Sequence, residues 1–247
     1  MKFYLGTHCL NHVDKSTVPL FLSNRVLMKR KKKRFNPQVN VSIDSGGFSE
    51  LSLYGEWRTT PEEYIDNVRR MEDLNLGIDW IASQDYMCED IMIRKTGLTV
   101  KEHQKKTIDK YIQLYDMNSG FEIVPILQGQ TIEDYINHIQ DYYERGFDLR
   151  YFKTVGVGSV CRRQNTQEIG NIMKKINSYG INIHGFGVKK QGLEKYGNYL
   201  SSADSLAWSF NARYNKEHCS KCYGIATTKN CANCLNYALE WRSKFIR

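Results

Sequence analysis

The chain has 247 residues, with 35 lysines and arginines against 27 aspartates and glutamates, and a formal net charge of +8. Its 41% hydrophobic and 25% charged residues are typical of a folded globular protein, which excludes a disordered or collagen-like chain. No run of about eighteen apolar residues occurs, and the first residues lack an export signal. We therefore expect no membrane partner and a cytoplasmic location, in the host cell if the protein is viral.

Short apolar runs alternate with longer stretches of helical periodicity. The first run lies near Phe3, and residues 40–44 form the second. Thr60, Pro61 and Glu63 then show the pattern of a capped helix start. The pattern continues with strands expected at 78–82, 122–127, 151–155, 181–184 and near Ser205, and with helices at 99–117, 132–143 and 169–176.

This alternation requires parallel strands joined by helical crossovers. With about seven strands in a chain of this length, we predict an α/β fold of the (β/α)8 TIM-barrel type, built as a single domain over residues 1–247. A doubly wound open sheet is the structural alternative.

Acids, amides and glycines follow the predicted strands, where a parallel barrel carries its active site. The segments are Asp44-Ser45-Gly46-Gly47-Phe48, Gln84-Asp85-Tyr86, Leu127-Gln128-Gly129-Gln130, Val155-Gly156-Val157-Gly158-Ser159, His184-Gly185-Phe186-Gly187-Val188 and Ser202-Ala203-Asp204-Ser205. Each alone is explained by turn-forming glycines and helix-capping aspartates. Six such segments, each directly after a predicted strand, favour a binding site for a planar ligand. Glycines at these positions allow the backbone to approach the ligand closely. Three of the acids, Asp44, Asp85 and Asp204, suit chemistry at an anomeric carbon.

The ordered series of segments resembles a known superfamily. Four of them are similar, in the same order, to tRNA-guanine transglycosylases: 44–48, 127–129, 155–158 and 185–187. Further segments resemble the DpdA family more closely, including 84–89, 95–97, 102–104, 158–163, 184–189, 202–209 and 237–242. DpdA proteins are transglycosylase homologues of phages and bacteria that place 7-deazaguanines into DNA.

The resemblance implies roles for individual residues. Asp204 matches the nucleophile that forms a covalent glycosyl-enzyme, and Asp44 matches the acid/base aspartate. Asp85 and Gln128 match positions that recognise a guanine-like ring. Further substrate contacts are expected from Ser45, Gly46, Gly129, Gly156, Gly158, Gly185 and Phe186. The aromatic residues Phe48, Tyr86 and Phe186 are candidates to stack on the base, although such side chains are often simply core.

Four cysteines near the C-terminus form a CxxC–x8–CxxC pattern, the spacing of tetrahedral zinc ligands: Cys219, Cys222, Cys231 and Cys234. We predict a structural Zn2+ in segment 218–234, followed by a C-terminal helix over 235–247, in preference to a redox pair or free thiols. His218 is a possible substitute ligand. The pattern differs from the Cys-x-Cys-x2-Cys and distant histidine of tRNA-guanine transglycosylases, which speaks against a tRNA enzyme. The remaining cysteines are expected to be buried thiols: Cys9, Cys88 and Cys161.

Six consecutive basic residues, 29–34, supply most of the net charge. Such a run is commonly a solvated loop, and as a functional segment it contacts nucleic-acid phosphates. We predict nucleic-acid contacts by Lys31, Lys32, Lys33, Arg162, Arg163 and Arg213.

The expected function is therefore a DNA guanine transglycosylase that exchanges guanine for a 7-deazaguanine, such as 7-cyano-7-deazaguanine. Its partners are DNA, whose target nucleotide must leave the base stack, and the free deazaguanine base. The alternatives are a tRNA-guanine transglycosylase and a non-catalytic, zinc-bearing nucleic-acid-binding subunit. The compact length favours DNA, because little chain remains for RNA-binding domains.

Overall fold

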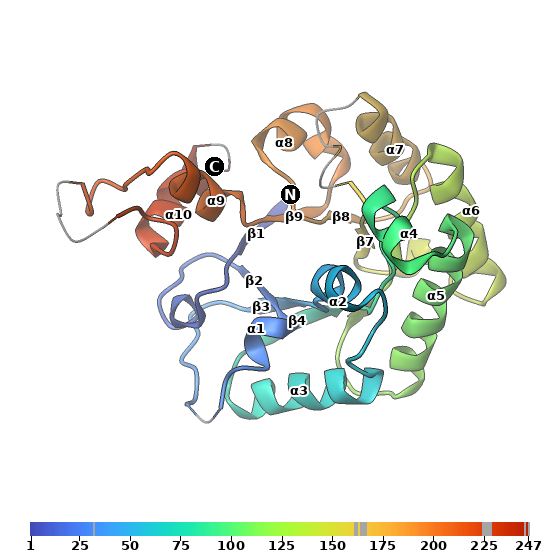
Figure 1. The fold of residues 1–247 in the computed structure, drawn as a ribbon, viewed down its shortest axis with the longest axis horizontal. Helices are drawn as coiled ribbons and strands as arrows, with labels where there is room; N and C mark the ends of the chain where they lie inside the picture. Colours follow the sequence, from blue (N-terminus) through green and yellow to red (C-terminus); the bar gives the residue numbers. More distant parts are fainter. Residues whose placement is uncertain (32, 161–162, 164–166, 224–228, 245, 247) are drawn as a thin grey trace.

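Parallel strands form the centre of the computed structural model, which describes residues 1–31, 33–160, 163, 167–223, 229–244 and 246 (Figure 1). In chain order the described strands are β1 (Lys2–Gly6), β2 (Leu20–Ser23), β3 (Val41–Asp44), β4 (Ile78–Ala82), β5 (Ile123–Val124), β6 (Ile126–Leu127), β7 (Val155–Val157), β8 (Ile183–Gly185) and β9 (Ser202–Ser205). Their order across the sheet is β5-β4-β3-β2-β1-β9-β8-β7-β6, and the neighbours pair in parallel.

The two ends of this sheet belong to one stretch of chain, because only Pro125 separates β5 from β6. β5 pairs with β4, whereas β6 pairs with β7. Proline has no amide hydrogen to donate, and the strand changes its pairing partner across this residue. If β5 and β6 are counted as one interrupted strand, the barrel has eight strands and is nearly closed. The predicted α/β barrel is confirmed.

Two predictions about strands are wrong. Strand β2 was not expected, because only the short 3-10 helix η1 (Leu10–His12) lies between it and β1, so no amphipathic helix marks the crossover. The strand predicted at 151–155 begins only at Val155. Residues Leu149–Tyr151 form the 3-10 helix η2 instead, because the Asp148 side chain accepts a hydrogen bond from the Arg150 amide and caps this turn.

Helices surround the barrel (Figure 1). They are α1 (Asn24–Leu27), α2 (Gly47–Tyr54), α3 (Pro61–Asp73), α4 (Asp90–Thr96), α5 (Val100–Asp116), α6 (Ile132–Glu144), α7 (Gln167–Asn177) and α8 (Lys190–Tyr196), followed by the 3-10 helix η3 (Gly197–Tyr199). Thr60, Thr99 and Thr131 form capping boxes that start α3, α5 and α6. The described helices include none long and apolar enough to cross a membrane.

The C-terminal part forms a lobe beside strands β1 and β9 (Figure 1). It contains α9 (Ala207–Tyr214), the four cysteines and α10 (Leu235–Ser243). Helix α10 starts where the C-terminal helix was predicted and ends earlier, while residues 245 and 247 lie outside the described residues.

Aromatic side chains fill the barrel interior. Tyr4, Phe21 and Trp80 pack together, and the Trp80 indole donates a hydrogen bond of 2.8 Å to the Tyr4 hydroxyl. The ring of His184 lies 4.9 Å from those of Trp80 and Phe186, centroid to centroid. This layer closes the barrel and forms the base on which the candidate site is built.

Candidate active site

A cavity of about 550 Å3 opens at the carboxyl ends of the barrel strands. Six predicted residues line it, each from a different strand end: Asp44, Asp85, Gln128, Gly158, Phe186 and Asp204. Asp44 and Asp204 belong to β3 and β9, and the other four residues follow β4, β6, β7 and β8. Phe21 and Ile126 of the aromatic layer line the cavity as well. The volume lies in the range of small-molecule sites, and the walls combine apolar surface with a few polar groups.

Asp44 is the last residue of β3 and lies in the cavity wall. Its Oδ2 accepts a hydrogen bond of 3.1 Å from the Gly46 amide, and the Ser23 hydroxyl donates a second one to its carboxylate. Burial raises the pKa of Asp44 to about 6, assisted by the negative charge of Asp204. A carboxyl group with this pKa can both give and take a proton near neutral pH.

Asp85 and Gln128 form a coupled pair of polar groups. The Gln128 side-chain amide donates a hydrogen bond to Asp85 Oδ2. On its other side, the Gln128 carbonyl oxygen accepts one of 2.5 Å from the Ser159 hydroxyl, which in turn accepts from the Cys88 amide. Burial raises the pKa of Asp85 to about 8, and the charge of Asp44 is the second cause. The pair thus presents a fixed donor and acceptor edge to a planar ligand.

Asp204 is buried in β9 and lines the cavity. Its Oδ1 accepts a hydrogen bond of 2.9 Å from the Gly187 amide and lies 3.4 Å from Nε2 of the buried His184. The other ring nitrogen, Nδ1, lies 2.9 Å from the Ser202 hydroxyl. These contacts hold one carboxylate oxygen and restrict the rotation of the side chain.

The four predicted metal ligands come together. The sulfur atoms of Cys219, Cys222, Cys231 and Cys234 all lie within 4.8 Å of one another, with separations of 3.7 and 3.9 Å among them. Tetrahedral zinc with Zn–S bonds of about 2.3 Å requires sulfurs about 3.8 Å apart. The cluster could therefore bind a metal ion and is consistent with zinc. Among the described residues, the group of possible ligands consists of these four cysteines and does not include His218.

The chain matches the family described as DpdA, DeoxyPurine in DNA protein A, over residues 1–247. The chain belongs to the DpdA family. A comparison with curated proteins found no match. Among solved structures, an isomerase-like protein from Sinorhizobium meliloti in an open-loop conformation is similar, with 11% identity and a TM-score of 0.41. The match covers 82% of this chain, and the chain spans only 49% of that protein.

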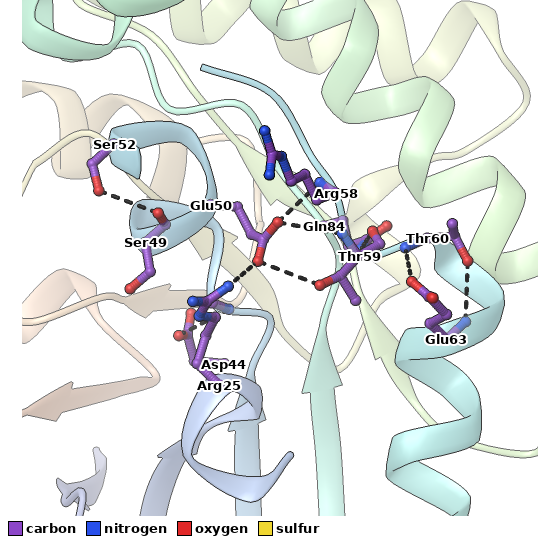
Figure 2. Close-up of polar contacts among 11 residues, drawn as sticks. Arg25, Asp44, Ser49, Glu50, Ser52, Arg58, Thr59, Thr60, Glu63 and Gln84 are labelled. Atoms are coloured by element: carbon purple, nitrogen blue, oxygen red, sulfur yellow. Dashed lines mark hydrogen bonds and ion pairs between the residues drawn. The ribbon is translucent and has the colours of Figure 1, made fainter. Parts of the chain in front are cut away.

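The site of this DpdA-family chain contains an ion pair that was not predicted. Arg25 of α1 lines the cavity, and its guanidinium binds the carboxylate of the buried Glu50 on α2 (Figure 2). Glu50 also accepts hydrogen bonds from the amides of Arg58 at 2.9 Å and Thr59 at 3.3 Å. Asp44 and Arg25 both line the cavity. A cation fixed by Glu50 therefore lies in the wall of the same cavity as the acid/base candidate.

Several predicted glycines make room for cavity residues. A Cβ on Gly158 would collide with the Gln128 amide, and one on Gly156 would lie 2.5 Å from the Phe186 ring. Gly46 has φ of +91°, which disfavours side chains, and a Cβ there would lie 2.6 Å from Arg25 Cγ. Gly129 and Gly185 are packed against Asp134 and Val188 instead. Of these, Gly158 lines the cavity.

The remaining predicted substrate contacts, Ser45, Phe48 and Tyr86, differ in their position relative to the cavity. Ser45 is buried, and its hydroxyl has no hydrogen-bond partner among the described residues. Phe48 lines the cavity and is 46% exposed. Tyr86 is buried against His103 and does not line the cavity, which fits its alternative role in the core.

The described residues among the predicted basic contacts lie outside the cavity lining. Lys31 and Lys33 are exposed in the connection before β3, at the end of the barrel opposite the cavity. Arg163 donates to the Gln130 carbonyl at 2.6 Å and forms an ion pair with Glu168. Arg213 is exposed on α9. Lys32, Arg162 and Cys161 fall outside the described residues.

Cys88 is buried as predicted, whereas Cys9 is only half-buried, so the expectation of a buried thiol is wrong for Cys9.

Proposed function

We propose that this protein is a DNA guanine transglycosylase, which removes guanine from a deoxynucleotide and inserts a 7-deazaguanine such as 7-cyano-7-deazaguanine. Membership of the DpdA family supports DNA as the polymer. One observation supports the chemistry: three carboxyl groups, Asp44, Asp85 and Asp204, border a single cavity together with Gln128. The proposal treats residues 1–247 as a single transglycosylase domain.

The first half of the reaction breaks the glycosidic bond. A carboxylate oxygen of Asp204 attacks C1′ of the flipped nucleotide, and the electron pair of the C1′–N9 bond leaves with the guanine. The hydrogen bond from Gly187 orients the carboxylate, and the second oxygen is available for attack. The product is a covalent deoxyribosyl ester of Asp204.

Asp44 handles the proton. In its neutral form it protonates the departing guanine, and the resulting carboxylate then removes N9–H from the incoming 7-deazaguanine. The deprotonated N9 attacks C1′, displaces Asp204 and restores the β-linkage, so that configuration is retained overall. A pKa of about 6 keeps both forms of Asp44 accessible at neutral pH. One glycosidic bond replaces another, and no external energy source is required.

Asp85 and Gln128 are assigned to base recognition. The edge of a guanine ring offers N–H donors at N1 and N2 and an acceptor at O6. Asp85 supplies a carbonyl oxygen as acceptor and, in the neutral form that its raised pKa favours, a hydroxyl donor. The Gln128 amide supplies a further donor, whose orientation is set by Ser159. Phe186 and Phe48 provide apolar surface for the ring faces.

The four-cysteine group is assigned to Zn2+. When bound, the ion would cross-link the two CxxC turns of the lobe. Four thiolates complete a tetrahedral shell and leave no position for substrate, so the assigned role is structural.

The decisive experiment is a base-exchange assay. The protein is incubated with guanine-containing DNA or with tRNA and labelled 7-cyano-7-deazaguanine, and label in each polymer is counted. We expect label in DNA, and its loss by about a thousandfold or more in Asp204→Asn and Asp44→Asn. Asp66→Asn on the exposed surface of α3 is the matched control.

Other outcomes point to the alternatives. Label in tRNA alone would identify a tRNA enzyme, and no label in either polymer despite tight nucleic-acid binding would favour a non-catalytic subunit. Full activity in both aspartate variants would refute the mechanism. A denaturant-resistant DNA adduct that disappears in Asp204→Asn would identify the nucleophile directly.

A further inference from the structure

Helix α9 exposes its apolar side chains to solvent. Leu206, Phe210 and Tyr214 follow one another at intervals of four residues and share one face, with exposures of 42%, 68% and 77%. The opposite face is buried through Trp208, Ser209 and Ala212. We call Leu206, Phe210 and Tyr214 the α9 shelf. Exposed apolar side chains gathered on one face mark interaction sites.

The two rings of the α9 shelf are arranged as a stack. Their centroids lie 5.7 Å apart, and their planes differ by only 9°. Each ring keeps most of its surface open to solvent. Flat open rings of this kind offer faces to other planar groups, and nucleobases are the planar groups that a strand of DNA supplies.

The shelf is continuous with the candidate active site. Leu206 lines the cavity and is separated from Asp204 by a single residue. Phe210 and Tyr214 follow one and two helical turns further, so the shelf leads away from the cavity mouth for about 12 Å. A nucleotide neighbouring the one whose base occupies the cavity would pass over this surface.

Charge and size favour nucleic acid over a protein partner. Arg213 lies between the two rings in sequence, and Lys216 follows the helix; both are exposed. Aromatic side chains bury at most about 250 Å2 each, so the shelf offers on the order of 400 Å2. A stable protein interface buries about 800 Å2 per partner, and its core is depleted in lysine.

We propose that the α9 shelf binds single-stranded DNA next to the target nucleotide, with flanking bases stacked on Phe210 and Tyr214 and a phosphate on Arg213. This inference rests on the proposed DNA substrate and names the surface that holds the strand open beside the cavity. When the target nucleotide leaves the base stack, the flanking base loses its stacking contact with the target base. Stacking on Phe210 or Tyr214 would replace that contact.

The test measures DNA binding separately from exchange. A short single-stranded DNA carries one guanine with 2-aminopurine beside it, whose fluorescence is quenched by stacking. We expect the wild-type protein to quench it, and the double variant Phe210→Ala/Tyr214→Ala to lose the quenching and to bind at least about tenfold more weakly.

Two further variants separate stacking from simple contact or misfolding. Phe210→Trp/Tyr214→Trp preserves flat rings and should retain affinity, whereas Phe210→Leu/Tyr214→Leu keeps apolar bulk and should not. Tyr143→Ala/Tyr151→Ala removes equally exposed rings at the opposite end of the barrel and should bind like wild type.

Unchanged affinity and quenching in the folded alanine variant would overturn the proposal. So would a dimeric wild type that becomes monomeric in that variant while its DNA binding persists, since the shelf would then join two copies of the chain. The outcome is independent of the exchange assay: a protein without exchange activity can still show shelf-dependent DNA binding, and an active one can lack it.

Discussion

Asp85 is a carboxyl group whose surroundings favour its neutral form. Burial and the charge of Asp44 raise its pKa from 3.8 to about 8, against the opposing effect of the hydrogen bond from Gln128. Between pH of about 4 and about 8 the folded protein therefore holds a proton that the unfolded chain has released. The free energy of unfolding should fall as the pH rises through this window and should level off above it.

Replacement of Asp85 by asparagine removes this titration. We expect the unfolding free energy of Asp85→Asn to fall less steeply from pH 4 to 8, and to exceed that of the wild type above pH 8 by about 1 kcal/mol or more. Urea unfolding at a series of pH values measures both slopes. Asp66→Asn, an exposed carboxyl change, should follow the wild type; parallel curves for Asp85→Asn and wild type would contradict the assigned pKa.

At the residue scale, strand-end position was enough to bring together Asp44, Asp85, Gln128 and Asp204, because parallel strands deliver their carboxyl ends to one side. The pair Arg25–Glu50 could not be found that way. Arg25 follows a strand that has no sequence signal, and its partner is defined only by how α1 and α2 pack. The buried contact between His184 and Asp204 likewise depends on two strands becoming neighbours.

At the scale of elements, β7 shows how glycine positions shape the site. Gly156 faces Phe186 so closely that a methyl group there would lie 2.5 Å from the ring and 3.3 Å from Ile126. Phe186 lines the cavity, and the aromatic layer behind it is filled. A larger residue at position 156 must therefore displace the Phe186 ring.

We expect Gly156→Ala to lower the affinity for 7-cyano-7-deazaguanine by about tenfold and stability by about 1–3 kcal/mol through overpacking. Tryptophan fluorescence titration and thermal unfolding measure the two effects. Gly170→Ala is the matched control, because a methyl group at that position in α7 meets nothing within 4 Å. It should bind normally and be slightly more stable. Equal binding by both variants would remove Phe186 from the base pocket.

Helices whose starts are marked by capping residues were predictable from the sequence. Strands that are defined by pairing with distant strands were less predictable. The starts of α3 and α5 follow from the capping residues Thr60 and Thr99, whose hydrogen bonds lie within one turn. Strand β2 has four residues and takes its identity from pairing with β1 and β3. Its apolar run is too short to be distinguished from a loop by periodicity.

At the scale of the whole molecule, the cysteine lobe is joined to the barrel near the cavity. Asn233, between two predicted metal ligands, accepts a hydrogen bond of 2.8 Å from His8, which lines the cavity. Its backbone carbonyl lies 3.1 Å from Nε2 of His12. The geometry of the four-cysteine cluster and the position of His8 are thus linked through one residue.

Removal of the metal should therefore affect more than the lobe. We expect a chelator to lower the melting temperature by about 5 °C or more, corresponding to ~2 kcal/mol, and to weaken base binding. Cys222→Ala should reproduce the loss and lower the bound zinc measured by mass spectrometry. Cys9→Ala, which changes a thiol outside the cluster, should do neither. A chelated protein with unchanged melting temperature would argue against a structural metal.

The barrel joins its first strand to its last described strand, since Lys2 of β1 lies opposite Ser202 of β9 and Tyr4 opposite Asp204. During synthesis on the ribosome, the edge of β1 that pairs with β9 therefore stays unpaired until nearly the entire barrel has been translated. The residue assigned as nucleophile enters the site in the same step that completes the sheet. Under the proposed mechanism, truncated or nascent chains would lack the attacking group, and base exchange would begin only after the fold is complete.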